Sequence, residues 1–295
     1  MTSYRGLPLL HLPIKLHAAI LALIMTAANL ALAAPLDAPG NVSFLALGDS
    51  IAFGSITQDG YAYVNARNFV AYPDYVGDDL RLDTTNAACP GETSSSFLSS
   101  IAFDPGCRAY KQLFPLHVAY ASTQFDFAMD FLATHKQAKL VTVALGANDL
   151  IVLQTVCAGN IACIQAGLPA ALATIGSNLN FILNSLRATG FRGVLMVVNY
   201  YSLDYSDPLL TGFTVLLNQT LATAAAANGA VVADVFKAFQ RAASTSFAAG
   251  ATCKTGLLNG NPQNQSLCDD HPSQSGHQLM SETIEATYRA ALAGS

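Results

Sequence analysis

The sequence contains no tryptophan and few charged residues, since Asp, Glu, Lys and Arg together make up 11% of it. Its six cysteines form no Cys-x-x-Cys pair and its histidines no His-x-x-x-His pair, so the clustered ligands of a metal site are missing and no metal is expected. Positive charge is also scarce, with 14 Lys and Arg against 19 Asp and Glu, which argues against nucleic acid as a partner. No repeat, linker or low-complexity run divides the chain, which predicts a single folded domain.

The first 33 residues contain neither Asp nor Glu. They carry Arg5 and Lys15 and then become almost entirely apolar, which is the pattern of a secretory signal peptide. The apolar run is shorter than the ~20 residues of a bilayer span, so we expect cleavage and no stable membrane insertion. Ala31-Leu32-Ala33 offers a cleavage site, which predicts a signal peptide at 1–33, one domain at 34–295, and a secreted, periplasmic or extracellular protein.

Six cysteines in an exported chain indicate three disulfides. Fifteen connectivities are possible, and we favour pairing between neighbours in the sequence. The favoured pairs are Cys89 with Cys107, Cys157 with Cys163, and Cys253 with Cys268. The last pair would close a loop that ends three residues before His271 and would hold that histidine's segment in place.

Five short runs are predicted as buried parallel strands separated by helices. The clearest helix is expected from Pro169 to Thr189, with leucines and isoleucines along one face and Gly190 as its stop. Alternation of strand and helix predicts an α/β fold with three layers, α/β/α, in which functional groups gather beyond the carboxyl ends of the strands. The predicted strands are Ser43–Leu47, an ill-defined Arg81–Ala87, Leu140–Leu145, Gly193–Val198 and Ala230–Val235.

A serine follows the first predicted strand directly. The apolar run that ends at Leu47 breaks into Gly48-Asp49-Ser50, which would deliver Ser50 at a strand end as a candidate nucleophile. A serine hydroxyl is a poor nucleophile while protonated and therefore needs a base. By itself this tripeptide indicates little, because Ser50 could equally cap a helical turn.

Three later segments supply what serine acyl transfer requires. They read Cys-Pro-Gly-Glu-Thr from Cys89, Leu-Gly-Ala-Asn-Asp from Leu145, and Cys-Asp-Asp-His-Pro-Ser from Cys268. His271 in the last segment is the favoured base, placed in a loop, and His277 in the following helix is the alternative. The oxyanion of the tetrahedral intermediate needs fixed hydrogen-bond donors. The candidate donors are the backbone N–H groups of Ser50 and Gly91 and the side-chain amide of Asn148.

In this order and context, Ser50, Gly91, Asn148 and His271 resemble the four blocks of the SGNH (GDSL-type) hydrolase family, over about residues 41 to 290. The similarity is to the secreted, disulfide-bearing bacterial esterases and lipases of that family, whose second block also reads Cys-Pro-Gly-Glu-Thr. The resemblance implies a mainly parallel, flavodoxin-like sheet of five strands. It also implies a serine nucleophile and no metal or organic cofactor.

The residue that orients the histidine is where this sequence departs from the family. The commonest pattern places an aspartate three residues before the histidine, and here that residue is Cys268. Asp269 and Asp270 compete for the role, and some branches of the family use the Asp-x-His spacing that fits Asp269. Other members orient the histidine with a backbone carbonyl. We assign Asp269 as the third catalytic residue.

The resemblance implies a secreted serine esterase or lipase that hydrolyses a carboxylic ester of a small molecule, lipid or glycan through an acyl-enzyme. A carbohydrate acetylesterase, a phospholipase or a thioesterase of the same fold is an alternative within the family. A non-catalytic exported binding protein is the alternative of another class, because a fold alone does not guarantee its chemistry. The sequence pattern sets neither the length of the acyl chain nor the oligomeric state.

Overall fold

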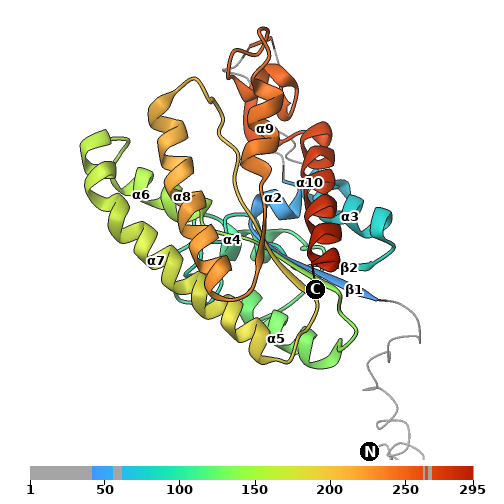
Figure 1. The fold of residues 1–295 in the computed structure, drawn as a ribbon. Coiled ribbons are helices and arrows are strands. Elements are labelled where there is room, and N and C mark those ends of the chain that lie inside the picture. The colour runs from blue at the N-terminus through green and yellow to red at the C-terminus, as the bar shows by residue number, and fades with distance from the viewer. Residues whose placement is uncertain (1–41, 56–61, 262, 265–267, 295) are drawn as a thin grey trace, which may run out of the picture. The chain divides into compact units, whose positions relative to one another are not determined.

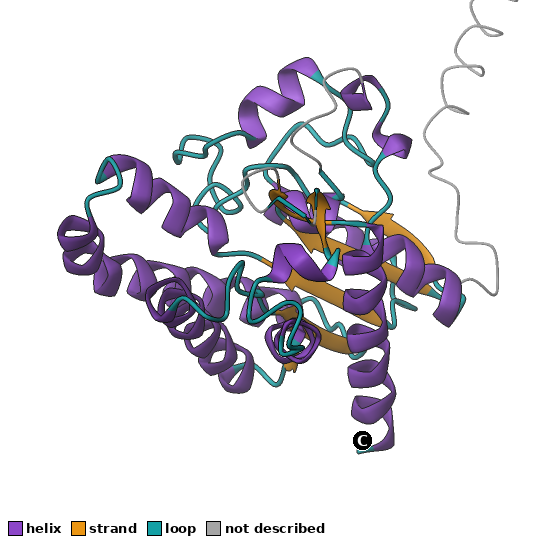
Figure 2. Ribbon diagram, turned by 90° about the horizontal axis from the view of Figure 1, so that it is seen from above, coloured by secondary structure: helices purple, strands orange, loops and turns teal. Residues whose placement is uncertain are grey.

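The computed structural model describes residues 42–55, 62–261, 263–264 and 268–294. The predicted signal peptide at 1–33 and its cleavage site lie outside these residues. The described part forms one compact unit within Asn41–Ser295. A parallel sheet of five strands stands at its centre, with helices on both sides (Figures 1 and 2).

The strand order in the sheet is β2-β1-β3-β4-β5, and every neighbouring pair is parallel. This is the flavodoxin-like order of a doubly wound fold, so the predicted architecture is confirmed. The edge strand β2 reads Asp-Thr-Thr-Asn and is only partly buried, so the expected buried run was wrong there, because an edge strand is covered less completely. The strands are β1 Ser43–Gly48, β2 Asp83–Asn86, β3 Leu140–Ala144, β4 Val194–Val198 and β5 Val231–Ala233.

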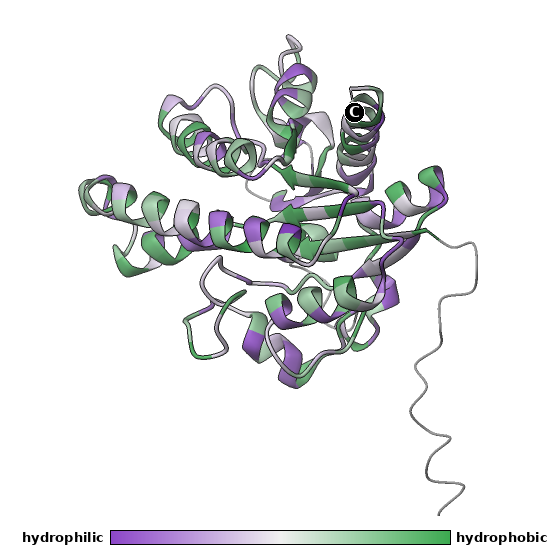
Figure 3. Ribbon diagram, turned by 60° about the horizontal axis from the view of Figure 1, so that its bottom comes forward, coloured by the Kyte–Doolittle hydropathy of each residue, from purple (hydrophilic) through white to green (hydrophobic). Residues whose placement is uncertain are grey.

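Alternate residues of the central strands feed two separate cores. In β1, Phe44 and Ala46 pack with helices α3, α9 and α10, whereas Leu45 and Leu47 pack with α5, α7 and α8. Because helices cover both faces, β1 and β3 are buried along their whole length, and Figure 3 shows these strands as hydrophobic segments between the helical layers. The helices are α2 Ser50–Phe53, α3 Tyr72–Leu80, α4 Cys107–Leu113, α5 Gln124–Thr134, α6 Ala147–Val156, α7 Ile161–Ala188, α8 Pro208–Ala227, α9 Val235–Ala243 and α10 Gln274–Ala293.

Helix α7 begins eight residues before the predicted start at Pro169. Asn160 caps it by accepting a hydrogen bond from the backbone N–H of Cys163 at 3.1 Å, and Pro169 lies inside the helix. The apolar face of the predicted segment is buried as expected, including Ile175 and Leu179. The predicted start is wrong because a proline, which is favoured in a first helical turn, is here tolerated in the interior.

Within the described ranges, two helices, α7 and α8, are long and apolar enough to cross a membrane by length and composition. The core helices of soluble proteins pass the same test. In the structure α7 and α8 lie side by side (Figure 1) and pack against the sheet through residues such as Leu179 and Leu221. The buried faces of both helices therefore contribute to the core on this side of the sheet.

The structure contains the three predicted disulfides. Cys89–Cys107 joins the segment after β2 to the start of α4, and Cys157–Cys163 joins the end of α6 to the start of α7. Cys253–Cys268 ties a 3₁₀ helix, Thr252–Thr255, to the short strand β7, Cys268–Pro272. Strand β7 pairs antiparallel with β6, Leu258–Gly260, beside the main sheet.

Candidate active site

The turn after β1 places Ser50 at the carboxyl edge of the sheet. Gly48 has a φ of 151°, and a Cβ there would lie 2.5 Å from the carbonyl oxygen of Ala144, so the close approach of β1 and β3 requires glycine. Asp49 caps the short helix α2 by accepting from the backbone N–H of Ile51 at 3.0 Å. Ser50 is the first residue of that helix, so its side chain stands where the strand ends.

Of the two candidate histidines, the structure brings His271 to Ser50. The Nε2 atom of His271 lies 2.8 Å from Oγ of Ser50. His271 belongs to the short strand β7 and not to a loop as predicted, because pairing with β6 extends this segment. His277 is buried in α10, and neither of its ring nitrogens has a hydrogen-bond partner in the described part of the chain. Burial lowers the pKa of His277 to about 3, so this ring stays neutral in its apolar surroundings.

Two carboxylates face the other ring nitrogen of His271. Oδ1 of Asp269 lies 2.7 Å from Nδ1 and also accepts the backbone N–H of His271 at 3.2 Å. Oδ1 of Asp270 lies 3.1 Å from the same nitrogen. The side chain of Asp269 is 2% exposed and that of Asp270 is 54% exposed, so Asp269 provides the sheltered contact and Asp270 a more solvated one.

The electrostatic surroundings of His271 favour its protonated form. Burial alone would lower the pKa of His271, but the hydrogen bonds and negative charges of Asp269 and Asp270 outweigh burial and raise this pKa to about 10. An imidazole with two carboxylates on Nδ1 is a stronger base at Nε2, the atom that faces Ser50. The arrangement would therefore stabilise an imidazolium if His271 took a proton from Ser50.

The segment that carries His271 is also held by contacts that do not involve Ser50 or the two carboxylates. The hydroxyl of Tyr201 donates to the backbone oxygen of Asp270 at 2.6 Å, and the Tyr201 ring stacks on Phe239 with centroids 4.4 Å apart. The Cys253–Cys268 disulfide anchors the beginning of the same strand. No local sequence signal identified Tyr201, because its partner is 69 residues away.

Two backbone amides and one side-chain amide are arranged near the same edge. Gly91 has a φ of 82°, and a Cβ there would meet the backbone nitrogen of Gly106 at 2.6 Å. The amides of Ser50 and Gly91 have no hydrogen-bond partner among the described residues. Asn148, in the first turn of α6, donates from Nδ2 to the backbone oxygen of Glu92 at 3.0 Å, which orients its amide and leaves a second hydrogen on Nδ2. Such amides are the kind of donor that an oxyanion requires.

The order of these residues matches a known family. Residues 46–279 match the GDSL-like lipase/acylhydrolase family, a range that begins just before Ser50 and includes His271. The chain belongs to this family. Comparison with curated protein sequences gave no significant match.

Solved structures share the fold of this GDSL hydrolase at low sequence identity. Phospholipase A1 from Streptomyces albidoflavus is 18% identical with a TM-score of 0.55, covering 84% of this chain and 100% of its own. The extracellular lipase from Streptomyces rimosus is 18% identical with a TM-score of 0.53, covering 83% and 99%. An acetylxylan esterase from Geobacillus stearothermophilus is 14% identical with a TM-score of 0.50, covering 84% and 94%. At these identities the likeness establishes the α/β fold.

A buried polar cluster supports the turn from Gly48 to Ser50 in this GDSL hydrolase, and sequence reasoning missed it. The side-chain oxygen of Gln124 accepts the backbone N–H of Gly48 at 2.6 Å, and its Nε2 donates to the Gly48 oxygen at 2.9 Å and to Glu92 at 3.1 Å. The Tyr200 hydroxyl donates to Asp49 at 2.6 Å. Burial raises the pKa of Asp49 to about 6 and that of Glu92 to about 7. These contacts join residues far apart in the sequence, so no motif could reveal them.

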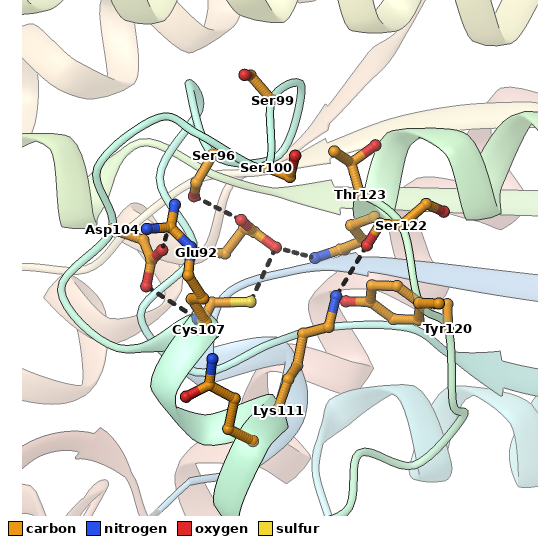
Figure 4. A pocket seen from close by; sticks show the side chains of 14 residues that line it. Glu92, Ser96, Ser99, Ser100, Asp104, Cys107, Lys111, Tyr120, Ser122 and Thr123 are labelled. Carbon is orange, nitrogen blue, oxygen red and sulfur yellow. Dashed lines mark hydrogen bonds and ion pairs between the residues drawn. The ribbon is translucent and has the colours of Figure 1, made fainter.

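Glu92 also forms the floor of a polar pocket of about 370 Å³ (Figure 4). The Ser96 hydroxyl donates to Glu92 at 2.5 Å, and Lys111 donates to the backbone oxygen of Ser122 at 2.8 Å across the same hollow. Arg108 donates to the Ala102 oxygen at 2.6 Å. The polar side chains drawn in Figure 4 therefore bond mainly to one another and to the backbone.

Two groups among the described residues have the ligand types of a metal site. Cys89, Glu92 and Cys107 form one group, but both cysteines are joined in a disulfide and have no thiolate to offer. Asp269, Asp270 and His271 form the other. In this second group Nδ1 of His271 is already hydrogen-bonded to the carboxylates, which is the arrangement of an oriented base.

Proposed function

We propose that this GDSL hydrolase is a secreted serine esterase or lipase that cleaves carboxylic esters through an acyl-enzyme intermediate. The observation that carries the proposal is the continuous contact from Ser50 Oγ to His271 Nε2, at 2.8 Å, and from His271 Nδ1 to Asp269, at 2.7 Å. A nucleophile, a base and an orienting carboxylate in hydrogen-bond contact are the arrangement that serine acyl transfer requires.

In the first half of the proposed reaction, His271 removes the proton of Ser50 as Oγ attacks the ester carbonyl carbon. The carbonyl oxygen becomes an oxyanion that accepts hydrogen bonds from the amides of Ser50 and Gly91 and from Asn148, donors worth about 3 kcal/mol each in such sites. The imidazolium of His271, stabilised by Asp269, then protonates the departing alcohol. The acyl group is left on Oγ of Ser50.

In the second half, water takes the place of the alcohol. His271 removes a proton from the water, the resulting hydroxide attacks the acyl carbon, and the same donors hold the second oxyanion. The proton on His271 returns to Ser50 as the carboxylic acid leaves. The chain's own side chains carry every proton in this scheme, which uses no metal or organic cofactor.

Secretion is supported by two independent features. The sequence of residues 1–33 has the charge and apolar pattern of a signal peptide, and three disulfides are stable in oxidising compartments. Among the similar structures, the Streptomyces rimosus protein is an extracellular lipase. We therefore place the mature enzyme outside the cytoplasm.

The decisive test is hydrolysis of p-nitrophenyl esters of short and long acyl chains by the purified protein. The variants Ser50→Ala and His271→Ala should each lower kcat by about 10⁴-fold or more. An exposed serine, Ser246, provides the control, because Ser246→Ala should hydrolyse the esters at the wild-type rate. Mass spectrometry after a burst of substrate should find the acyl adduct on Ser50.

The alternatives predict other results. A carbohydrate acetylesterase or a phospholipase of this fold would show the same dependence on Ser50 but would prefer acetylated oligosaccharides or phospholipids in a substrate panel. A thioesterase would prefer acyl thioesters in the same panel. A folded wild-type protein that hydrolyses no ester would favour the non-catalytic binding protein.

A further inference from the structure

An apolar groove of about 450 Å³ opens beside the candidate active site. Three of its lining residues are direct sequence neighbours of site residues: Ile51 follows Ser50, Ala147 precedes Asn148, and Asp270 precedes His271. Helices α6, α7 and α8, which lie together in Figure 1, form most of its walls, and Tyr200, Tyr201 and Leu203 line it from the segment after β4. The groove therefore lies next to the residues that would hold the ester carbonyl.

The walls of the groove suit hydrocarbon. Leucine and isoleucine predominate on all three helices, with Leu150 on α6, Leu168 on α7 and Leu217 on α8 as examples. Among the described lining residues, Asp207 and Asp270 carry charge and none is basic. A phosphate headgroup would find no basic side chain among these residues, and the apolar lining residues outnumber the polar ones, which suits a hydrocarbon chain better than a sugar.

Several apolar side chains at the rim remain partly exposed, although Leu150 packs against the core. Helix α6 contains Leu150, Ile151, Val152 and Leu153, yet Asn148 is its only buried residue. At the rim, Ile151, Ile161 and Leu209 are 39%, 43% and 39% exposed. A cluster of exposed apolar side chains next to a site marks a surface that a ligand covers.

We propose that this groove binds the acyl chain of the substrate, so that the enzyme prefers medium and long fatty acyl esters over acetyl esters. This inference rests on the proposed serine esterase function and names its substrate class. The ester carbonyl would sit at Ser50, and the chain would run over Ile51 between α6 and α8. Ile161 lines the groove at the start of α7 and lies between the two cysteines of the Cys157–Cys163 bridge, so this bridged hairpin forms one wall.

The test is a series of p-nitrophenyl esters from acetate to decanoate, measured below their critical micelle concentrations. Each methylene that enters the groove should raise kcat/KM by about fourfold, until the groove is full. A charge in the wall should remove this gain. Leu209→Asp should therefore lower kcat/KM for decanoate by about tenfold or more, with less than about a twofold change for acetate.

Helix α8 offers a matched control. Leu216 has nearly the same exposure as Leu209, 41% against 39%, but does not line the groove. Leu216→Asp should leave the whole acyl series unchanged. Binding of p-nitrophenyl decanoate to the Ser50→Ala variant, measured by calorimetry, adds a readout without catalysis. Adding Leu209→Asp to this variant should abolish the binding.

The outcomes separate this inference from the proposed function. A flat or acetate-preferring profile that depends on Ser50, with equal effects of the two leucine variants, would overturn the groove and leave the esterase standing. Activity that falls in both variants on lipid vesicles but in neither on dissolved esters would mark a lipid-docking face and also overturn it. No hydrolysis of any ester by folded protein would overturn the function itself.

Discussion

Two hollows border the segments that carry the candidate site, and they differ in what their side chains already bond to. In the polar pocket of Figure 4, Glu92 accepts from Ser96 and Gln124, and Lys111 and Arg108 donate to backbone carbonyls. In the apolar groove, leucine and isoleucine side chains remain partly exposed. Polar groups that satisfy one another build a rigid support, whereas uncovered apolar groups leave a place for a ligand. We therefore interpret the polar pocket as scaffold and the groove as substrate site.

The largest expected effect is the loss of kcat on replacing Gly91, a candidate oxyanion donor that directly precedes Glu92 of the polar pocket. In Gly91→Ala, the new Cβ would approach the Gly106 nitrogen to 2.6 Å and displace the amide, so kcat should fall by about 10² to 10³-fold. Gly159 is the control, because it also has a positive φ, 73°, but a Cβ added there would have no heavy atom within 4 Å. Gly159→Ala should cost about 1 kcal/mol of unfolding free energy and keep wild-type kcat. Equal loss of kcat in both variants would contradict the role of Gly91.

The next effect tests whether the polar side is a support. Gln124→Ala would leave the Gly48 N–H unpaired in a buried place and would leave the Gly48 oxygen with only the N–H of Cys89 as a donor. The free energy of unfolding should fall by about 3 kcal/mol, and kcat should fall as well. Gln112 lines the same pocket but is exposed, so Gln112→Ala should change the free energy by less than about 0.5 kcal/mol. Urea unfolding of both variants measures the difference. If the two variants unfolded alike, the pocket would not be a scaffold.

The disulfides allow an effect of similar size to be assigned to separate regions of the molecule. Replacing Cys253 and Cys268 with serine should destabilise the protein by about 3 kcal/mol and lower kcat on every ester, because this bridge anchors β7 and His271. The corresponding change at Cys157 and Cys163 touches only the α6–α7 hairpin beside the groove. That variant should keep its activity on acetate and change only its preference among long acyl chains.

In the wild type, activity should fall at lower reductant concentration than the circular dichroism signal. Two coincident curves would contradict the bracing role of Cys253–Cys268.

The smallest effect is on pH dependence. Asp270, at the mouth of the groove, helps to raise the pKa of His271, and the base works only when neutral, so the acidic limb of the kcat/KM profile should lie at high pH. Asp270→Asn removes one of the two carboxylates and should move that limb to lower pH. Asp207→Asn is the control, because Asp207 caps α8 and an asparagine can keep this role. An identical limb in wild type and Asp270→Asn would show that Asp269 alone sets the pKa of His271.

Much of the fold was predictable because its signals are local. Each of the five apolar or mixed runs forms a strand of the sheet, and the turn residues after β1 and β3 lie at its carboxyl edge. The start of α7 was not predictable, because Asn160 and the disulfide at Cys157 outweigh the usual meaning of Pro169. Strand β7 was not predictable either, because its partner β6 has no pattern of its own.

The residues of the candidate site also fall into those that the sequence predicts and those that only the structure reveals. Ser50, Gly91, Asn148 and His271 could be named from four short motifs, whose residue types are dictated by the chemistry of acyl transfer. The choice of His271 over His277 and the second carboxylate at Asp270 depend on distances that only the folded chain defines. The supports at Gln124 and Tyr200 carried no sequence signal, since a glutamine or tyrosine at such positions is ordinary.

The sequence by itself determined the family, the strand and helix alternation and the candidate residues for the chemistry, because each of these depends on residue type and short spacing. Only the tertiary structure decided which disulfide pairing forms, which carboxylates reach His271, how the turn at Ser50 is supported, and that α6, α7 and α8 leave an apolar groove beside Ser50. These features arise from side chains that the doubly wound sheet brings together from distant segments, and no local pattern encodes such distances.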